Sequence, residues 1–132
     1  MTAPLVVDTN ALIALFDGNK AIAERLFRAG RIIVPAVVCG EMDVGTRGNT
    51  RRESRVRAAF DKFLSLPRVE IGPVVRNTGP FYATVYNFCR AQGRPIPTND
   101  LWIAATALET GAVVLTSDVH LLQLPLLRAE SF

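Results

Sequence analysis

The stretch Leu5-Val6-Val7-Asp8-Thr9-Asn10 indicates how this chain folds. Three aliphatic residues are enough for a short buried strand, and Asp8 ends that strand where a helical pattern begins. Asp8 therefore either caps the helix or stands in the crevice beyond the carboxyl ends of a parallel sheet, where open α/β sheets bind their ligands. From this stretch alone, the helix cap is the favoured interpretation.

Strand and helix patterns alternate along the rest of the chain. We expect helices over residues 10–17, 20–29, 36–42, 51–65, 73–92 (divided at Gly79-Pro80), 98–109 and 120–122, and further strands over residues 31–34, 68–71, 112–115 and 126–128. Pro35 is expected to end the second strand, because proline cannot donate to a strand ladder. The alternation predicts an α/β fold in which helices cover both faces of a short parallel sheet. We expect three layers, α/β/α, with four to five strands in one domain over residues 1–132.

Composition restricts the class of protein. A hydrophobic content of 49% and a charged content of 20% are typical of a globular chain. The start lacks a basic side chain and its apolar run is broken by Asp8, which argues against a secretory signal. Residues 32–40 are uncharged but too few to span a bilayer. We expect a cytoplasmic protein without a membrane segment, whose Cys39 and Cys89 are buried free thiols.

Four acidic residues occupy positions that can share one crevice. Asp8 and Asp118 each follow a predicted strand, Glu41 lies in the helix after the second strand, and Asp100 opens the helix before the fourth. Individually, Asp100 and Asp118 could be helix caps and Glu41 could pair with an arginine. Together, four carboxylates would repel one another unless a cation lay between them. Mg²⁺ or Mn²⁺ is the cofactor that such oxygen ligands favour, and it supports phosphodiester hydrolysis.

Other catalytic motifs are missing from the sequence. It has no Gly-x-Gly-x-x-Gly, no Gly-x-x-x-x-Gly-Lys and no His-Glu-x-x-His. His120 is the only histidine and is more readily explained as a rim or core residue than as a ligand. A metal site built from acids is therefore the favoured chemistry.

The basic residues are unevenly distributed. Thirteen of the fifteen are arginines, and one segment holds five of them: Arg47, Arg51, Arg52, Arg55 and Arg57. Arginine pairs with phosphate through two parallel hydrogen bonds, so this cluster suggests a polyanionic partner such as RNA. A solvated helix face explains it equally well, and the sequence leaves both interpretations open.

Four pieces of the sequence, Val7-Asp8-Thr9-Asn10, Glu41, residues 99–107 and Leu115-Thr116-Ser117-Asp118, together resemble PIN-domain proteins. Among these proteins, the chain most resembles the VapC-like toxins of prokaryotic toxin–antitoxin pairs. The resemblance implies an Mg²⁺- or Mn²⁺-dependent endoribonuclease.

The resemblance also implies roles for particular residues and partners. Asp8, Asp100 and Asp118 correspond to metal ligands, Glu41 to a ligand or water-orienting group, and Thr116 and Asn10 to groups that position the substrate. A homodimer and a small inhibitory antitoxin are implied, with DNA contacted only through the antitoxin.

One departure from the family pattern concerns the number of metal ions. Many relatives carry a further acid shortly after the fourth one, where this chain has Val119 and His120. This favours one firm metal site, with a second completed by the substrate. Two alternatives stay open: a PIN-type nuclease without a toxin role, acting in RNA processing or on DNA, and a catalytically silent RNA-binding α/β module.

Overall fold

A parallel sheet of five strands lies at the centre of the molecule in the computed structural model, which describes residues 2–132. The strand order is β3-β2-β1-β4-β5, and all neighbouring strands run parallel. The strands are β1 (Leu5–Val7), β2 (Ile32–Pro35), β3 (Val69–Gly72), β4 (Val113–Leu115) and β5 (Arg128–Glu130). The predicted parallel sheet is confirmed, and its five strands fall within the expected four to five.

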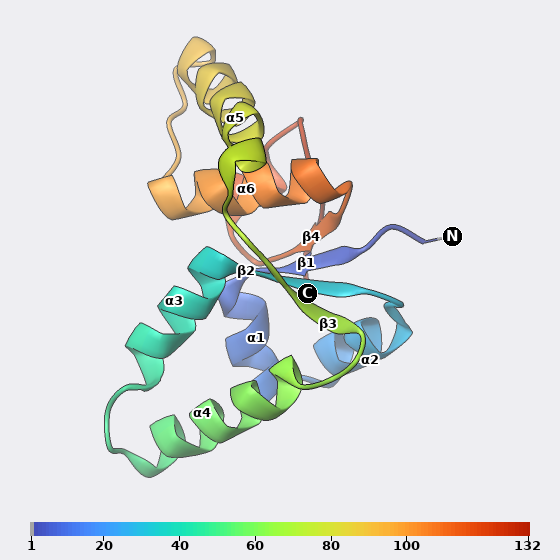
Figure 1. The fold of residues 1–132 in the computed structure, drawn as a ribbon, viewed down its shortest axis with the longest axis vertical. Coiled ribbons are helices and arrows are strands. Elements are labelled where there is room, and N and C mark those ends of the chain that lie inside the picture. The colour runs from blue at the N-terminus through green and yellow to red at the C-terminus, as the bar shows by residue number, and fades with distance from the viewer. Residues whose placement is uncertain (1) are drawn as a thin grey trace.

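Helices cover both faces of this sheet. The chain before β3 supplies α1 (Thr9–Phe16), α2 (Lys20–Arg28), α3 (Ala36–Thr46) and α4 (Arg51–Leu64). The chain after β3 supplies η1 (Arg76–Thr78), α5 (Gly79–Ala91), α6 (Thr98–Thr110) and α7 (Val119–Leu122). Figure 1 shows α5 and α6 above the strands and α1, α2 and α4 below them. The predicted three-layer α/β/α arrangement is therefore confirmed.

The first strand lies in the middle of the sheet and is its most buried part. Leu5, Val6 and Val7 are all 0% exposed, because strands flank β1 on both sides and helices cover both of its faces. An aliphatic run without alternation is the expected sequence for such a strand. The carboxyl end of β1, which carries Asp8, is consequently held in a fixed place by the core.

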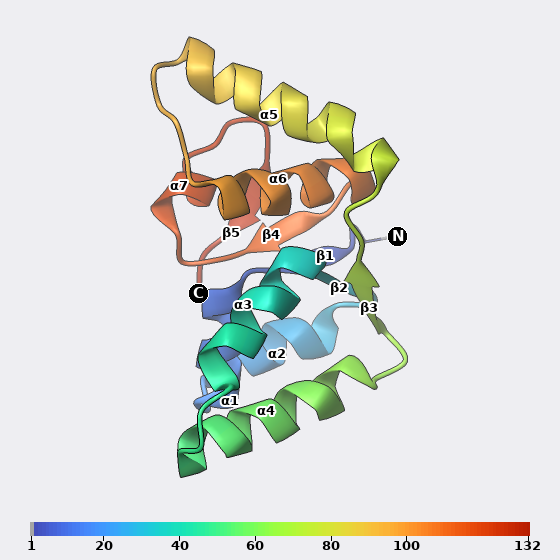
Figure 2. The same ribbon diagram turned by 60° about the vertical axis from the view of Figure 1, so that its left-hand side comes forward.

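Helix α3 connects the two halves of the molecule near the carboxyl ends of the strands. It follows β2 directly and packs against both α4 and α6 (Figure 2). This position lets a residue of α3 face residues from the start of α6.

Pro35 is the last residue of β2, in register with Gly72, so the expected end of this strand is confirmed to within one residue. Two other expectations about element ends were wrong. Helix α3 continues to Thr46, beyond the predicted end at residue 42. The last strand begins at Arg128 and not at Leu126, since Leu126 and Leu127 pack against the core in the preceding turn.

Two further expectations concern the cysteines and the membrane. Cys39 and Cys89 are both free thiols as expected, but only Cys89 is buried, and the expectation for Cys39 was wrong because it is half-buried. No helix within residues 2–132 combines the length and apolar character that crossing a bilayer requires.

Candidate active site

A pocket of about 530 Å³ opens at the carboxyl ends of β1 and β4. These strands are parallel neighbours, with Val7 level with Leu115, so the residues that follow them emerge side by side. The pocket is lined by Asp8, Thr9, Asn10, Ile13, Ala14, Asp17, Glu41, Asp100 and Asp118. The structure thus brings all four predicted acids together, and we call this site the acidic pocket.

Asp8 is the most thoroughly hydrogen-bonded acid of the pocket. Its Oδ1 accepts from the backbone N–H of Thr9 at 2.8 Å, so Asp8 caps α1 as well as facing the pocket. Its Oδ2 accepts from the Thr116 hydroxyl at 2.7 Å and from Asn10 Nδ2 at 3.1 Å. The side chain is only 5% exposed. Three donors therefore fix the Asp8 carboxylate before any ligand binds.

Thr116 connects the ends of the two central strands. Its hydroxyl is fully buried, donates to Asp8 and accepts from the backbone N–H of Asp118 at 2.9 Å. Asn10 supports the same connection, since its Oδ1 accepts from the backbone N–H of Ser117 at 3.1 Å. The two residues predicted to position the substrate therefore act, in this structure, on the orientation of Asp8 and Asp118.

Glu41 and Asp118 each accept a hydrogen bond from a neighbouring group. Glu41 lies on α3 and its Oε1 accepts from the Thr9 hydroxyl at 3.0 Å. The Oδ1 of Asp118 accepts from the backbone N–H of His120 at 2.9 Å, which makes Asp118 the N-cap of α7. The cap interpretation of Asp118 is correct, and the cap does not keep it out of the pocket.

Asp100 differs from the other three acids. Helix α6 begins two residues earlier, at Thr98, so Asp100 lies inside the first turn and the cap interpretation is wrong. The residue is 8% exposed, and its Oδ2 is the one buried side-chain oxygen or nitrogen within residues 2–132 that lacks a hydrogen-bond partner. Burial raises the pKa of Asp100 to about 7, aided by a proton shared with Asp118 and by the charges of Asp118, Asp8 and Glu41.

The groups that face the acidic pocket suit a hard divalent cation. The polar atoms of its lining side chains are oxygens of carboxylates, a hydroxyl and an amide, apart from the Asn10 amide nitrogen. Mg²⁺ and Mn²⁺ prefer such oxygens. Across residues 2–132, no three His, Cys, Asp or Glu side chains are already grouped closely enough to hold a metal ion.

The arginine cluster lies beside this pocket and is partly engaged in the fold. Arg52 Nη2 lies 2.8 Å from Asp17 Oδ2, and Arg55 Nη2 lies 3.6 Å from Asp17 Oδ1. Arg57 donates to the backbone carbonyls of Thr46 and Gly48. The contacts of Arg52 and Arg55 attach the start of α4 to the end of α1, and those of Arg57 attach α4 to the end of α3 and the turn after it. Part of the cluster therefore has a structural role at the rim of the pocket.

Sequence reasoning missed Thr9 and Asp17 as members of the site. Thr9, Ile13 and Asp17 recur every four residues, so they lie on one face of α1, and all three line the pocket. That spacing was the available signal for Thr9. The pairing of Asp17 with arginines of α4 depends on tertiary packing and leaves no local signal.

Comparison with known proteins agrees with this geometry. The family model described as PIN domain matches residues 5–126. The protein named Ribonuclease VapC1 from Haemophilus influenzae (strain R2866) is 34% identical over 118 residues, covering 86% of each chain.

Solved structures show the same fold. VapBC-1 from nontypeable Haemophilus influenzae superposes with a TM-score of 0.80 at 30% identity, covering 97% of each chain. VapBC2 from Rickettsia felis, bound to a DNA fragment from its promoter, gives a TM-score of 0.84 at 22% identity, covering 97% of this chain and 98% of that one.

Proposed function

Because this chain belongs to the PIN-domain family, we propose that it is a metal-dependent endoribonuclease of the VapC-like toxins, hydrolysing RNA phosphodiester bonds through its acidic pocket. The name of its relative, Ribonuclease VapC1, supports RNA as the substrate. The whole chain, residues 1–132, would act as a single domain.

The observation that carries this proposal is the Oδ2 atom of Asp100, which is buried and has no hydrogen-bond partner. A buried oxygen without a hydrogen-bond partner costs folding free energy, and three nearby acids add to that cost. Asp8 and Asp118 also serve as helix caps, but Asp100 has no such structural role. A bound cation would satisfy the free oxygen and relieve the repulsion, so the pocket is best explained as a metal site.

The acids would hold Mg²⁺ or Mn²⁺ through Asp8, Asp100 and Asp118, with Glu41 as a further ligand or as the group that orients water. When bound, such an ion activates water and stabilises the developing negative charge on phosphate oxygens. We favour one firm metal site, with a second completed by the substrate.

The residues around the acids would orient them and the substrate. Thr116 and Asn10 hold the Asp8 carboxylate in one rotamer, so it cannot swing out of the pocket. The Thr9 hydroxyl does the same for Glu41. Such fixed geometry lowers the activation free energy, because the side chains are already ordered in the folded protein.

The positive charge at the pocket rim would bind the RNA backbone. Arg52 and Arg55 stand at the rim through their contacts with Asp17, and Arg47 and Arg51 are exposed nearby in sequence. Each guanidinium can pair with a phosphate in a bidentate manner.

The partners would follow the VapBC pattern. Two of the structures with the same fold are described as VapBC complexes, and one of these is bound to promoter DNA. We propose that a small VapB-like antitoxin inhibits this chain, that DNA is contacted only through that antitoxin, and that the chain is a homodimer acting in the cytoplasm.

The test of the activity is RNA cleavage by the purified protein. We expect cleavage with Mg²⁺ or Mn²⁺, and loss of cleavage with a chelator or with Asp8→Ala. Since Asp8 also caps α1, circular dichroism must show that the variant folds. Undiminished cleavage by a folded Asp8→Ala protein would contradict the proposal.

The toxin role needs a separate experiment. Expression of the chain should arrest growth, and co-expression of a small protein encoded beside it should restore growth. Normal growth with soluble, RNA-cleaving protein would favour a PIN-type nuclease without a toxin role.

A further inference from the structure

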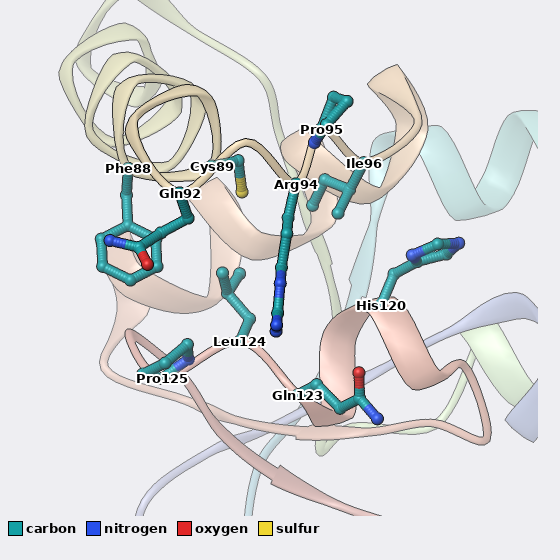
Figure 3. A pocket seen from close by; sticks show the side chains of 10 residues that line it. All are labelled: Phe88, Cys89, Gln92, Arg94, Pro95, Ile96, His120, Gln123, Leu124 and Pro125. Atoms are coloured by element: carbon teal, nitrogen blue, oxygen red, sulfur yellow. The ribbon is translucent and has the colours of Figure 1, made fainter.

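A second pocket, of about 430 Å³, lies between the loop at residues 93–97 and the segment formed by α7 and the turn after it. Figure 3 shows Phe88 of α5 and Gln92, the residue that follows α5, on one side, His120 on the other, and the extended Arg94 side chain between them. Ile96 and Gln123 also line this pocket. We call it the basic pocket.

The two walls of the basic pocket each lead into an acid of the acidic pocket. One wall includes Ile96, and the chain then enters the first turn of α6, which carries Asp100. The other wall includes His120, whose backbone N–H donates to Asp118 at 2.9 Å. The basic pocket is therefore built on the same two chain segments as the acidic pocket, because Ile96 shortly precedes Asp100 and His120 closely follows Asp118 in the sequence.

The charge of the basic pocket is opposite to that of its neighbour. None of its lining residues is acidic, and Arg94 supplies a positive charge. Among residues 2–132, no carboxylate lies within 4 Å of the Arg94 guanidinium, whereas Arg25, Arg31, Arg52 and Arg55 all have such partners. A free guanidinium beside a catalytic centre can bind a phosphate.

The rest of the lining suits a nucleobase. Phe88 and Ile96 are half-buried and offer apolar surface on which a flat ring can stack. Gln92 and Gln123 each present an amide that can both donate and accept at the edge of a base. An apolar surface, two amides and one guanidinium are complementary to one nucleotide.

From this combination we propose that the basic pocket binds the nucleotide next to the phosphodiester bond that the acidic pocket would cleave. Arg94 contacts its phosphate, Phe88 and Ile96 contact its base, and Gln92 and Gln123 read the base edge. The proposal rests on the proposed ribonuclease function, since the basic pocket would bind the part of the RNA that lies beyond the reacting phosphate. The basic pocket then contributes to the choice of cleavage site.

The first experiment compares Arg94→Ala with Arg90→Ala in steady-state cleavage of a short RNA. Arg90 is exposed on α5 and lies outside the basic pocket, so it gives a matched loss of charge. We expect Arg94→Ala to raise KM by roughly tenfold, as for the loss of one charge-assisted hydrogen bond, with kcat nearly unchanged. Arg90→Ala should leave both constants near those of the parent protein.

The second experiment does not depend on catalysis. Nucleoside 5′-monophosphates are titrated into the ¹⁵N-labelled protein in chelator, and ribose 5-phosphate serves as the phosphate-only probe. We expect the nucleotides to shift the amide signals of Gln92, Arg94 and Gln123, and ribose 5-phosphate to shift mainly that of Arg94.

The outcomes separate the two proposals. Active protein whose KM is unaffected by Arg94→Ala, together with nucleotides that leave these signals unmoved, would overturn the nucleotide pocket and keep the ribonuclease. A protein that cleaves no RNA but shows the expected shifts would contradict the ribonuclease and keep a nucleotide pocket.

Discussion

Asp8 and Asp100, on two sides of the acidic pocket, differ in how many hydrogen bonds the folded protein gives their carboxylates. Asp8 accepts three hydrogen bonds and also caps a helix, so the fold alone explains why an acid stands there. Asp100 is equally buried, yet one of its oxygens has no partner and its pKa is raised to about 7. A buried group that the fold does not satisfy points to a ligand more strongly than one that the fold already uses.

Because of this difference, substitutions at the two acids should affect stability and function in different proportions. Removing a group on the Asp8 side should disturb both, because its donors and acceptors belong to the folded framework. Removing the charge of Asp100 should impair function without lowering stability.

The largest effect is expected for Asp100→Asn. Cleavage should fall more than roughly 100-fold, beyond the 10–100-fold typical for a group that merely supports a metal ligand. In chelator the variant should melt at the same temperature as the parent protein or higher, because a repelled charge is gone. Asp61→Asn, an exposed acid on α4, is the control and should leave both measurements unchanged. Substantial cleavage by Asp100→Asn would contradict the proposed role of the Asp100 charge in function.

The next effect is the pH dependence of stability in chelator. The folded-state pKa of Asp100 is about 7, above its ordinary value of 3.8, so the folded protein holds this proton more tightly than the unfolded chain. The stabilisation is complete below about pH 4 and is lost as the pH rises toward 7, at a cost on the order of a few kcal/mol.

Urea unfolding at pH 5 and pH 8 measures this dependence. Asp100→Asn lacks the titrating group, so it should gain stability relative to the parent protein between pH 5 and pH 8. Parallel pH profiles of the two proteins would mean that Asp100 is not the titrating group.

A smaller effect is expected on the Asp8 side for Thr116→Val. The substitution keeps the shape of the side chain but removes a hydroxyl that both donates and accepts. We expect a loss of about 1–3 kcal/mol in the free energy of unfolding, because Asp8 then lacks a donor and the Asp118 N–H lacks an acceptor. Thr84→Val, at an exposed position of α5, should change stability by less than about 0.5 kcal/mol.

The smallest effect on stability is expected for Arg52→Ala. Its partner Asp17 differs from both Asp8 and Asp100, because it is exposed and forms an ion pair at the pocket rim. The Arg52 side chain is 53% exposed and the Asp17 side chain 42%. Such a pair contributes less than about 1 kcal/mol. If Arg52 also binds RNA, the variant should bind a labelled RNA more weakly while unfolding at nearly the same urea concentration. Unchanged RNA affinity would leave Arg52 a purely structural role.

The meeting of the four acids could be predicted because each acid has a recognisable position next to a predicted strand or helix. A short aliphatic strand followed by an acid occurs twice, at Asp8 and Asp118, and parallel strands bring their carboxyl ends to one edge. The identity of the residues at that edge then follows from the order of the elements.

The sequence could not distinguish the roles of the acids. Thr98, Asn99 and Asp100 are all residues that favour a helix cap, so residue preference left Asp100 as a possible cap. In the structure Pro97 is the N-cap and α6 begins at Thr98, which places Asp100 inside the first turn. The contact of Asp17 with Arg52 spans 35 residues and depends on how α1 meets α4. The start of β5 was misplaced because two leucines look like a strand but pack as a turn.

A Mn²⁺ titration of the melting temperature, run on the parent protein and on Asp100→Asn, tests directly whether the acidic pocket binds a metal ion. Binding to the folded state alone raises the melting temperature as the ion concentration passes the dissociation constant. The account predicts a rise for the parent protein that a chelator reverses and that is absent in Asp100→Asn. A parent protein whose melting temperature does not respond to Mn²⁺ or Mg²⁺ would contradict a metal site in the acidic pocket.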